Sequence, residues 1–400
     1  MMHLAPFSIA RLPHILFGEG RVADIPAQVA VLGKRVLIIT GAKSFRTTAH
    51  WDALQKSLRE QNIQKETFTV SGEPSPDVVD QAVKDYQNSD IEVVLGIGGG
   101  SVLDAAKAIA GLLPHGNSVM DHLEGVGKGI AYQGPAIPFI AVPTTAGTGS
   151  EATKNAVLSR QGEFKKSFRH ECLVPQVAIV DPALLASCPA DLLAANGMDA
   201  FTQLLESYVS SNANPLTDAL AMSGMTAFRD GFFAAYEGKD DATIQAGHNQ
   251  LAYAALLSGI TLAQTGLGSV HGLASPLGAF FPCPHGVVCG TLVAEATDIN
   301  INALRERMPD SIALGKYANV GALLTNHPPP TEAPSIEFCT RLVEILRNWT
   351  ARLALTKLST YGMQLTDLNK VIANCRGGSM KTNPIVLTDS ELRELLQRRL

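Results

Sequence analysis

Three consecutive glycines that follow an apolar run constrain this chain more than any other feature of its sequence. Ile91–Ile97 is short and mostly apolar, as is typical of a parallel strand covered on both faces. Gly98, Gly99 and Gly100 come next, and because glycine has no Cβ, their backbone N–H groups can approach a ligand closely. The pattern predicts a buried strand, a tight turn and a helix that begins at Ser101.

The start of this helix is suited to binding an anion. Ser101 is a favourable N-cap, and Asp104 can complete a variant of the capping box. The free N–H groups and the positive end of the helix dipole would then face the glycine loop, where a dinucleotide pyrophosphate fits. For the glycines alone, a tight turn without a ligand remains the alternative.

Strands and helices alternate before this loop. Arg35–Thr40 is a predicted strand, and the spacing from about Phe45 to Gln61 is helical. Lys65–Val70 is a second predicted strand, followed by an amphipathic helix over Pro76–Tyr86 with its proline near the N-terminus. Such alternation predicts a mostly parallel sheet with helices on both sides.

A second loop rich in hydroxyl groups follows another apolar strand, Ile137–Val142. The loop, Pro143–Glu151, contains Thr144, Thr145 and Thr148, which offer donors to a phosphate, a ribose or a carboxamide. Taken alone, it could equally be a loop capped by its own hydroxyls. Because ligands of open α/β sheets bind outside the carboxyl ends of the strands, we expect both loops to contact one ligand.

The second half of the chain is predominantly helical in its spacing. Asp199 and Gln203 are four residues apart, which places them on one face of a helix. His271 and His285 lie in a segment that is otherwise apolar or rich in Gly and Pro, so both imidazoles need polar partners. These four side chains could form a divalent-metal site, whereas histidines hydrogen-bonded to backbone in the core are the alternative.

Several of these motifs, in this order, resemble the iron-containing (group III) alcohol dehydrogenase family over nearly the whole chain. The glycine loop continues as Ser101-x-x-Asp104-x-x-Lys107, and the segment around Asp199 reads Gly197-Met-Asp-Ala200. Other segments that match the family in position are Pro13–Gly20, Glu73–Pro76, Val180–Pro182 and Thr382–Pro384.

The resemblance implies a dehydroquinate-synthase-like, group III alcohol dehydrogenase fold. Residues 1–185 would form an α/β dinucleotide-binding domain, and residues 186–400 an all-helical domain for the metal and the substrate. A cleft between the two would hold NAD(P) and a divalent metal, Fe²⁺ or Zn²⁺. From the family we also expect a homodimer or a higher homo-oligomer.

Two positions depart from the family pattern. Gln203 stands where most members have a histidine ligand, which indicates a divergent branch. We expect Asp199, His271 and His285 to bind the metal, with Gln203 as a weak fourth ligand through its oxygen or replaced by water. Ser275 stands where the family usually has a further histidine, thought to help in proton transfer. The predicted catalytic residues are therefore His271, His285 and Ser275, and the metal would bind weakly.

The choice of cofactor depends on the loop after the first long strand. Members that prefer NAD often carry an acidic residue at the position of Gly41, whereas here no carboxylate would repel a 2′-phosphate. Lys43, Ser44 and Arg46 could contact that phosphate, which favours NADP; the alternative is that the two basic side chains are simply solvated.

The remainder of the cofactor can be assigned to the two loops. We expect Gly98, Gly99, Gly100, Ser101 and Asp104 to form the pyrophosphate site. The side chains expected near the nicotinamide and its ribose are Thr144, Thr145, Thr148 and Lys165. Lys166 is the alternative to Lys165.

Composition excludes several other classes of protein. The net charge is −5 without a basic cluster, which argues against nucleic-acid binding. No apolar run reaches the length of a membrane span, and the N-terminus does not resemble a secretion signal. The six cysteines are scattered, as is typical of reduced thiols in the cytoplasm.

These features together predict an NAD(P)-dependent oxidoreductase that interconverts a small alcohol and its aldehyde or ketone. The metal would act as a Lewis acid on the substrate oxygen, and the nicotinamide would accept or donate the hydride. Two alternatives remain: a lyase or synthase of the dehydroquinate-synthase-like fold, and a nucleotide-binding protein without catalysis.

Overall fold

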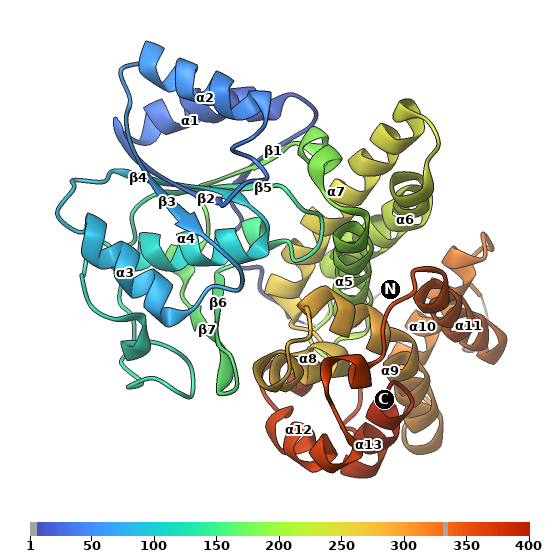
Figure 1. The fold of residues 1–400 in the computed structure, drawn as a ribbon. Helices are drawn as coiled ribbons and strands as arrows, with labels where there is room; N and C mark the ends of the chain where they lie inside the picture. The colour runs from blue at the N-terminus through green and yellow to red at the C-terminus, as the bar shows by residue number, and fades with distance from the viewer. Residues whose placement is uncertain (1–5, 331–334) are drawn as a thin grey trace.

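A parallel β-sheet occupies the N-terminal part of the molecule (Figure 1). The computed structural model describes residues 6–330 and 335–400. The sheet has the strand order β1-β8-β5-β4-β2-β3, and each neighbouring pair is parallel, as predicted. Its strands are β1 His14–Phe17, β2 Arg35–Gly41, β3 Gln64–Val70, β4 Val93–Gly98, β5 Phe139–Pro143 and β8 Val177–Val180.

Helices cover both faces of this sheet because successive strand residues point to opposite sides. Leu37 and Ile39 of β2 pack in a core with α3 and α4, whereas Val36 and Ile38 pack in a second core with α1 and α2. The four helices are α1 Ile25–Leu32, α2 Ala49–Glu60, α3 Pro76–Tyr86 and α4 Gly100–Leu112.

Two helix starts differ from the prediction. Helix α2 begins at Ala49 and not near Phe45, because Thr48, the N-cap residue, is extended and Phe45 turns into the core. Helix α4 begins at Gly100 with Gly99 as its N-cap, and no side chain caps it. The predicted capping box at this helix is therefore wrong.

Asp104 holds another part of the chain in place of that capping box. Its carboxylate accepts hydrogen bonds from Ser150 Oγ and from the backbone N–H of Val157, at 3.0 Å for the latter. These bonds attach the end of the hydroxyl-rich loop and the hairpin that follows it to α4. Asp104 therefore fixes the position of the hydroxyl-rich loop relative to α4.

That hairpin consists of β6 Asn155–Arg160 and β7 Phe164–Arg169, paired antiparallel. It packs against α4 on one side, and β7 packs against α8 on the other. Lys165 lies on β7, opposite Ser159. The hairpin therefore lies between the sheet and the C-terminal helices.

The described C-terminal part is helical. The last described strand ends at Val180 and α5 begins at Ala190; the division at 185/186 remains a prediction. No single described helix is long and apolar enough to cross a membrane; α7 and α8 meet that criterion only as a pair, bent by 99°. The helices are α5 Ala190–Val209, α6 Pro215–Glu237, α7 Asp241–Thr265, α8 Ser269–Phe280, α9 His285–Arg307, α10 Ile312–Leu324, α11 Ile336–Arg352, α12 Leu368–Asn374 and α13 Asp389–Gln397.

Candidate active site

A cleft of about 910 Å³ is lined by residues of both parts of the chain. The start of α4, the hydroxyl-rich loop and the β6–β7 hairpin form the side that belongs to the sheet. Helices α5, α8 and α9 form the opposite side. Most of the residues predicted for the site lie along this cleft.

The glycine loop and the hydroxyl-rich loop meet at the sheet side of the cleft. A Cβ on Gly99 would lie 3.2 Å from Thr145 Oγ1, and a Cβ on Gly100 would lie 2.8 Å from Thr148 Oγ1. These four residues and Ser101 line the cleft. Because the first turn of a helix leaves its N–H groups without partners in the helix, the start of α4 can bind a phosphate there.

Two residues predicted for this site lie behind it. Gly98 is the last residue of β4, where a Cβ would meet Val102 at 2.6 Å. Thr144 is buried, and its backbone N–H donates to Gly98 O at 3.0 Å. Both are outside the lining of the cleft and support the two loops.

The predicted 2′-phosphate site lies beside the cleft, at the end of β2. A Cβ on Gly41 would lie 3.9 Å from Val102 Cγ2, which itself lines the cleft. Lys43 and Ser44 are exposed. Arg46 is engaged elsewhere: its Nε donates to Thr40 Oγ1 at 2.7 Å.

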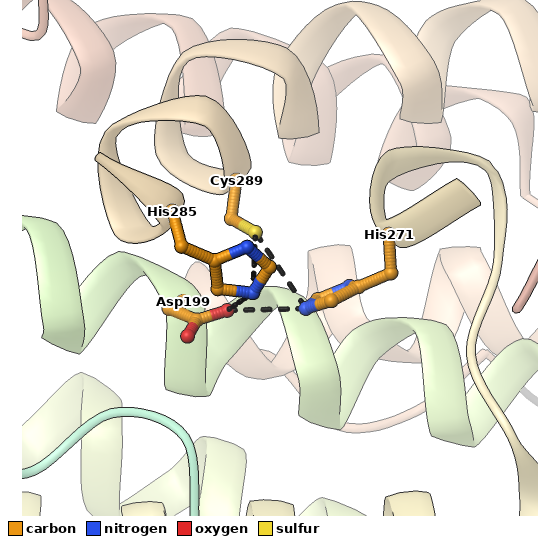
Figure 2. A group of neighbouring side chains, drawn as sticks. All are labelled: Asp199, His271, His285 and Cys289. Atoms are coloured by element: carbon orange, nitrogen blue, oxygen red, sulfur yellow. Dashed lines mark hydrogen bonds and ion pairs between the residues drawn. The ribbon is translucent and has the colours of Figure 1, made fainter. Parts of the chain in front are cut away.

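On the opposite side of the cleft, four side chains from three helices converge (Figure 2). We call Asp199, His271, His285 and Cys289 the α5 cluster. Asp199 Oδ1 lies 3.1 Å from His271 Nε2 and 3.8 Å from His285 Nε2. Cys289 Sγ lies 3.5 Å and 3.8 Å from the same two nitrogens. One potential ligand atom from each residue lies within 4.8 Å of the others.

The pairing of this cluster, and the protonation of Asp199 and His285, suit a cation. Burial lowers the pKa of His271, but Cys289, Asp199 and Glu206 outweigh it and raise that pKa well above its usual value, so His271 would release its Nε2 proton to a metal. Within residues 6–330 and 335–400, Asp199 Oδ2 and His285 Nδ1 are buried without a hydrogen-bond partner. Burial raises the pKa of Asp199, but His285 and His271 outweigh it and lower that pKa to about 2. Burial, with Lys165 and His271, lowers the pKa of His285 to about 4. A carboxylate and a neutral imidazole are the forms that bind a divalent metal.

Glu206, which the sequence analysis did not single out, orients one of these ligands. His271 Nδ1 donates to Glu206 Oε2 at 2.7 Å, and the backbone N–H of Val270 donates to Glu206 Oε1 at 2.7 Å. With Nδ1 fixed in this way, Nε2 faces the cluster. A carboxylate behind a histidine ligand is the usual support for a metal site. Asp199 and Glu206 lie on the same helix, two turns apart, which is the signal that could have identified Glu206.

Gln203 lies beside the cluster with its amide nitrogen toward it. Its Nε2 donates to Asp199 Oδ1 at 3.4 Å, and its Oε1 accepts from Ser258 Oγ at 2.9 Å. Because a carboxylate oxygen requires a donor opposite it, the amide oxygen points away from the cluster.

Lys165 and Ser275 meet between the two sides of the cleft. Lys165 Nζ forms an ion pair with Glu73 Oε2 at 2.9 Å, and Ser275 Oγ donates to the backbone oxygen of Lys165 at 3.1 Å. Lys166, the rival of Lys165, also lines the cleft. The Lys165 ammonium is therefore held by the carboxylate of Glu73 near the α5 cluster.

Comparison with known proteins identifies the family. A model described as iron-containing alcohol dehydrogenase matches residues 13–182, and one for the C-terminal part of that family matches residues 193–400. Alcohol dehydrogenase 4 of Saccharomyces cerevisiae is 29% identical over 392 residues, 96% of each chain. The NAD-dependent methanol dehydrogenase of Bacillus methanolicus is 32% identical over 298 residues, 74% of this chain and 76% of the other.

A solved structure of a 1,3-propanediol oxidoreductase has the same fold, with a TM-score of 0.87 at 26% identity over 99% of this chain and 100% of the other. These matches confirm the predicted fold and the alcohol oxidoreductase prediction over the lyase and the non-catalytic alternatives. They also support NAD and a metal as cofactors. The chain belongs to the iron-containing alcohol dehydrogenase family.

Proposed function

We propose that this enzyme interconverts a small alcohol and its aldehyde or ketone with a nicotinamide dinucleotide and one divalent metal ion bound in the cleft. One observation carries the proposal: the phosphate-binding loop at the start of α4 and the α5 cluster line the same cleft. Hydride transfer requires that the cofactor and the substrate oxygen be held together, and this arrangement provides for both.

Asp199, His271 and His285 are the residues we assign to the metal. The ion would act as a Lewis acid on the substrate oxygen and lower the pKa of the alcohol. Glu206 holds His271 with Nε2 toward the ion, and burial keeps His285 neutral. The negative charge on Asp199 offsets part of the charge of the ion.

Gly99, Gly100 and Ser101 are assigned to the pyrophosphate, and Thr145 and Thr148 to the nicotinamide end of the cofactor. Gly98 and Thr144, which we expected to contact the cofactor, are assigned to the support of these loops.

Ser275 donates its hydroxyl hydrogen to the backbone oxygen of Lys165, so it can act only as an acceptor toward a substrate hydroxyl in the cleft. It lies one turn after His271 on α8 and lines the cleft. A serine hydroxyl is not a base at neutral pH, so Ser275 can orient the substrate but cannot retain its proton.

The preference for NADP rests on Gly41 and its neighbours. No carboxylate stands at Gly41 to accept the ribose hydroxyls, while Lys43 and Ser44 are exposed beside it. Initial rates with both cofactors test this directly: kcat/KM is expected to be higher with NADPH, and Gly41→Asp to shift the ratio toward NADH by about tenfold. A parent enzyme that prefers NADH tenfold contradicts the assignment.

The reaction itself is tested with the purified enzyme and a panel of aldehydes and alcohols, followed by the absorbance of the reduced nicotinamide. Chelation is expected to abolish turnover, and Fe²⁺ or Zn²⁺ to restore it. Asp199→Asn is expected to lower kcat by about 10³-fold, since loss of the metal removes several kcal/mol of stabilisation. Full turnover after exhaustive chelation would contradict the assignment of a catalytic metal.

A further inference from the structure

We propose that Cys289 is the fourth protein ligand of the metal in this chain, in place of the residue at position 203, and that its thiolate shifts the preference of the site toward Zn²⁺. The inference rests on the metal site of the proposed function, and it concerns which side chains build that site. Neither the sequence analysis nor the family pattern pointed to this cysteine.

The distances within the α5 cluster agree with tetrahedral coordination. Bonds of about 2.0–2.3 Å from zinc to nitrogen, oxygen and sulfur place neighbouring ligand atoms about 3.3–3.6 Å apart. Cys289 Sγ lies 3.5 Å from His271 Nε2 and 3.8 Å from His285 Nε2. Asp199 Oδ1 lies at 3.1 Å and 3.8 Å from the same nitrogens. Sulfur is thus as well placed as the carboxylate.

The helix register explains why Cys289 points into the cluster. His285 is the first residue of α9 and Cys289 follows one turn later, so both side chains project from one face toward Asp199 (Figure 2). Cys289 is fully buried. A buried thiol is ordinarily inert, but a divalent ion deprotonates a thiol that coordinates it.

Gln203 is in no position to take this role. Its oxygen accepts a hydrogen bond from Ser258 Oγ at 2.9 Å, and its Nε2, which has no lone pair to donate, faces Asp199. A rotation of the amide would bring two oxygens together at Asp199 and remove the donor that this carboxylate receives from Gln203. The residue at 203 therefore supports Asp199, and the sulfur completes the ligand set.

The change of ligand has a consequence for metal choice. Thiolate is a soft donor that favours Zn²⁺, whereas carboxylate and amide oxygens favour harder ions. A set of one carboxylate, two imidazoles and one thiolate provides four donors, and the substrate oxygen would be the fifth.

Cobalt substitution tests the proposal. Apo-enzyme is titrated with Co²⁺, and the near-ultraviolet thiolate-to-cobalt charge-transfer band is recorded for the parent, Cys289→Ser and Cys283→Ser. Cys283 is the matched control, because it is also buried and lies two residues before His285. The parent and Cys283→Ser are expected to show the band, and Cys289→Ser to lose it. Binding of reduced nicotinamide, followed by its fluorescence, verifies that each variant is folded.

Zinc affinity, measured by competition with a chelator, is the second readout. Cys289→Ser is expected to lower it by at least about 100-fold, since loss of a partner behind a ligand alone costs about 10- to 100-fold. Gln203→Ala is expected to change it far less. A band that persists in Cys289→Ser, or Co²⁺ bound by the parent without the band, overturns the proposal and leaves the metal site intact. A parent that binds no Co²⁺ overturns both.

Discussion

Two buried clusters of ionisable side chains border the same cleft, and they differ in how completely their polar atoms are paired. The first, the α4 cluster, consists of Asp104, Lys107 and Ser150. Lys107 is fully buried, and burial lowers its pKa to about 8, so it is charged at neutral pH. Its three N–H groups are shared among four oxygens at 2.7–3.1 Å: Ser150 O, Ser150 Oγ, Thr153 Oγ1 and Asn155 O.

The α5 cluster is buried to a similar degree but is left incomplete. Asp199 Oδ2 and His285 Nδ1 have no partner among the described residues, and Cys289 Sγ lies between two imidazole nitrogens. An unpaired buried polar atom is costly, so a fold that retains several of them in one place indicates a site completed by a ligand. The saturated α4 cluster therefore maintains the shape of the loop, whereas the unsaturated α5 cluster is suited to bind a ligand.

The comparison is tested most severely by Lys107→Met. This change removes the donor from the buried oxygens around Lys107 and leaves Asp104 without its counter-charge, so we expect the free energy of unfolding to fall by about 3–5 kcal/mol. Because Lys107 holds the loop that lines the cleft, the KM for the cofactor should also rise. Urea unfolding and initial-rate kinetics measure the two effects.

Lys165→Met is the control for that experiment. The Lys165 side chain is 11% exposed, but its partner Glu73 is 50% exposed, so the loss of this pair should cost less stability than the loss of Lys107. Its effect should fall on turnover, since it lies in the cleft. Equal losses of stability in the two variants would show that Lys107 is not the structural residue.

Much of the fold follows from local patterns. The predicted helix Pro76–Tyr86 has those bounds in the structure, because its proline and its Ser75 cap are local signals. Helix α4 begins at Gly100, one residue before the predicted start, and its N-cap is Gly99 and not Ser101. Asp104 serves a contact 53 residues away, at Val157. Such contacts have no signature in local spacing.

The residues of the site also divide into those with a signal in the sequence and those that only distant contacts reveal. Asp199, His271 and His285 were predicted from motifs of the family and do converge. Cys289 and Glu206 lie at helical spacings from His285 and Asp199, respectively, but many side chains share such spacings. Only the packing of α5, α8 and α9 shows that Cys289 faces both histidines and that Glu206 contacts His271 from behind.

Glu206→Gln tests the α5 cluster. The amide has one oxygen and no charge, so it holds His271 less firmly, and we expect metal affinity to fall by about 10- to 100-fold. Competition with a chelator measures this. Glu151→Gln, a change of a buried carboxylate near the α4 cluster, should leave metal affinity within about twofold. Equal effects of the two variants would remove the distinction between the clusters.

The last effect we expect is a pH dependence of stability that arises at the α4 cluster. Burial raises the pKa of Glu151 from 4.5 to about 7. Between these values the folded chain binds more protons than the unfolded chain at this residue, so its contribution to stability decreases as the pH rises. Above pH 7 the carboxylate is charged in both states, and the full cost of burying that charge remains.

Glu151→Gln removes this titration. The stability of the variant relative to the parent should therefore increase from pH 5 to pH 8, by about 2–3 kcal/mol for a pKa of about 7 in the folded chain. Urea unfolding of both proteins at the two pH values provides the difference. A difference that does not change with pH would mean that Glu151 is already ionised in the folded protein at pH 5, with Lys107 as a full counter-charge. The charges of the α4 cluster would then be fully paired, as its hydrogen bonds are. The two clusters would differ in the pairing of their charges as well as in the pairing of their polar atoms.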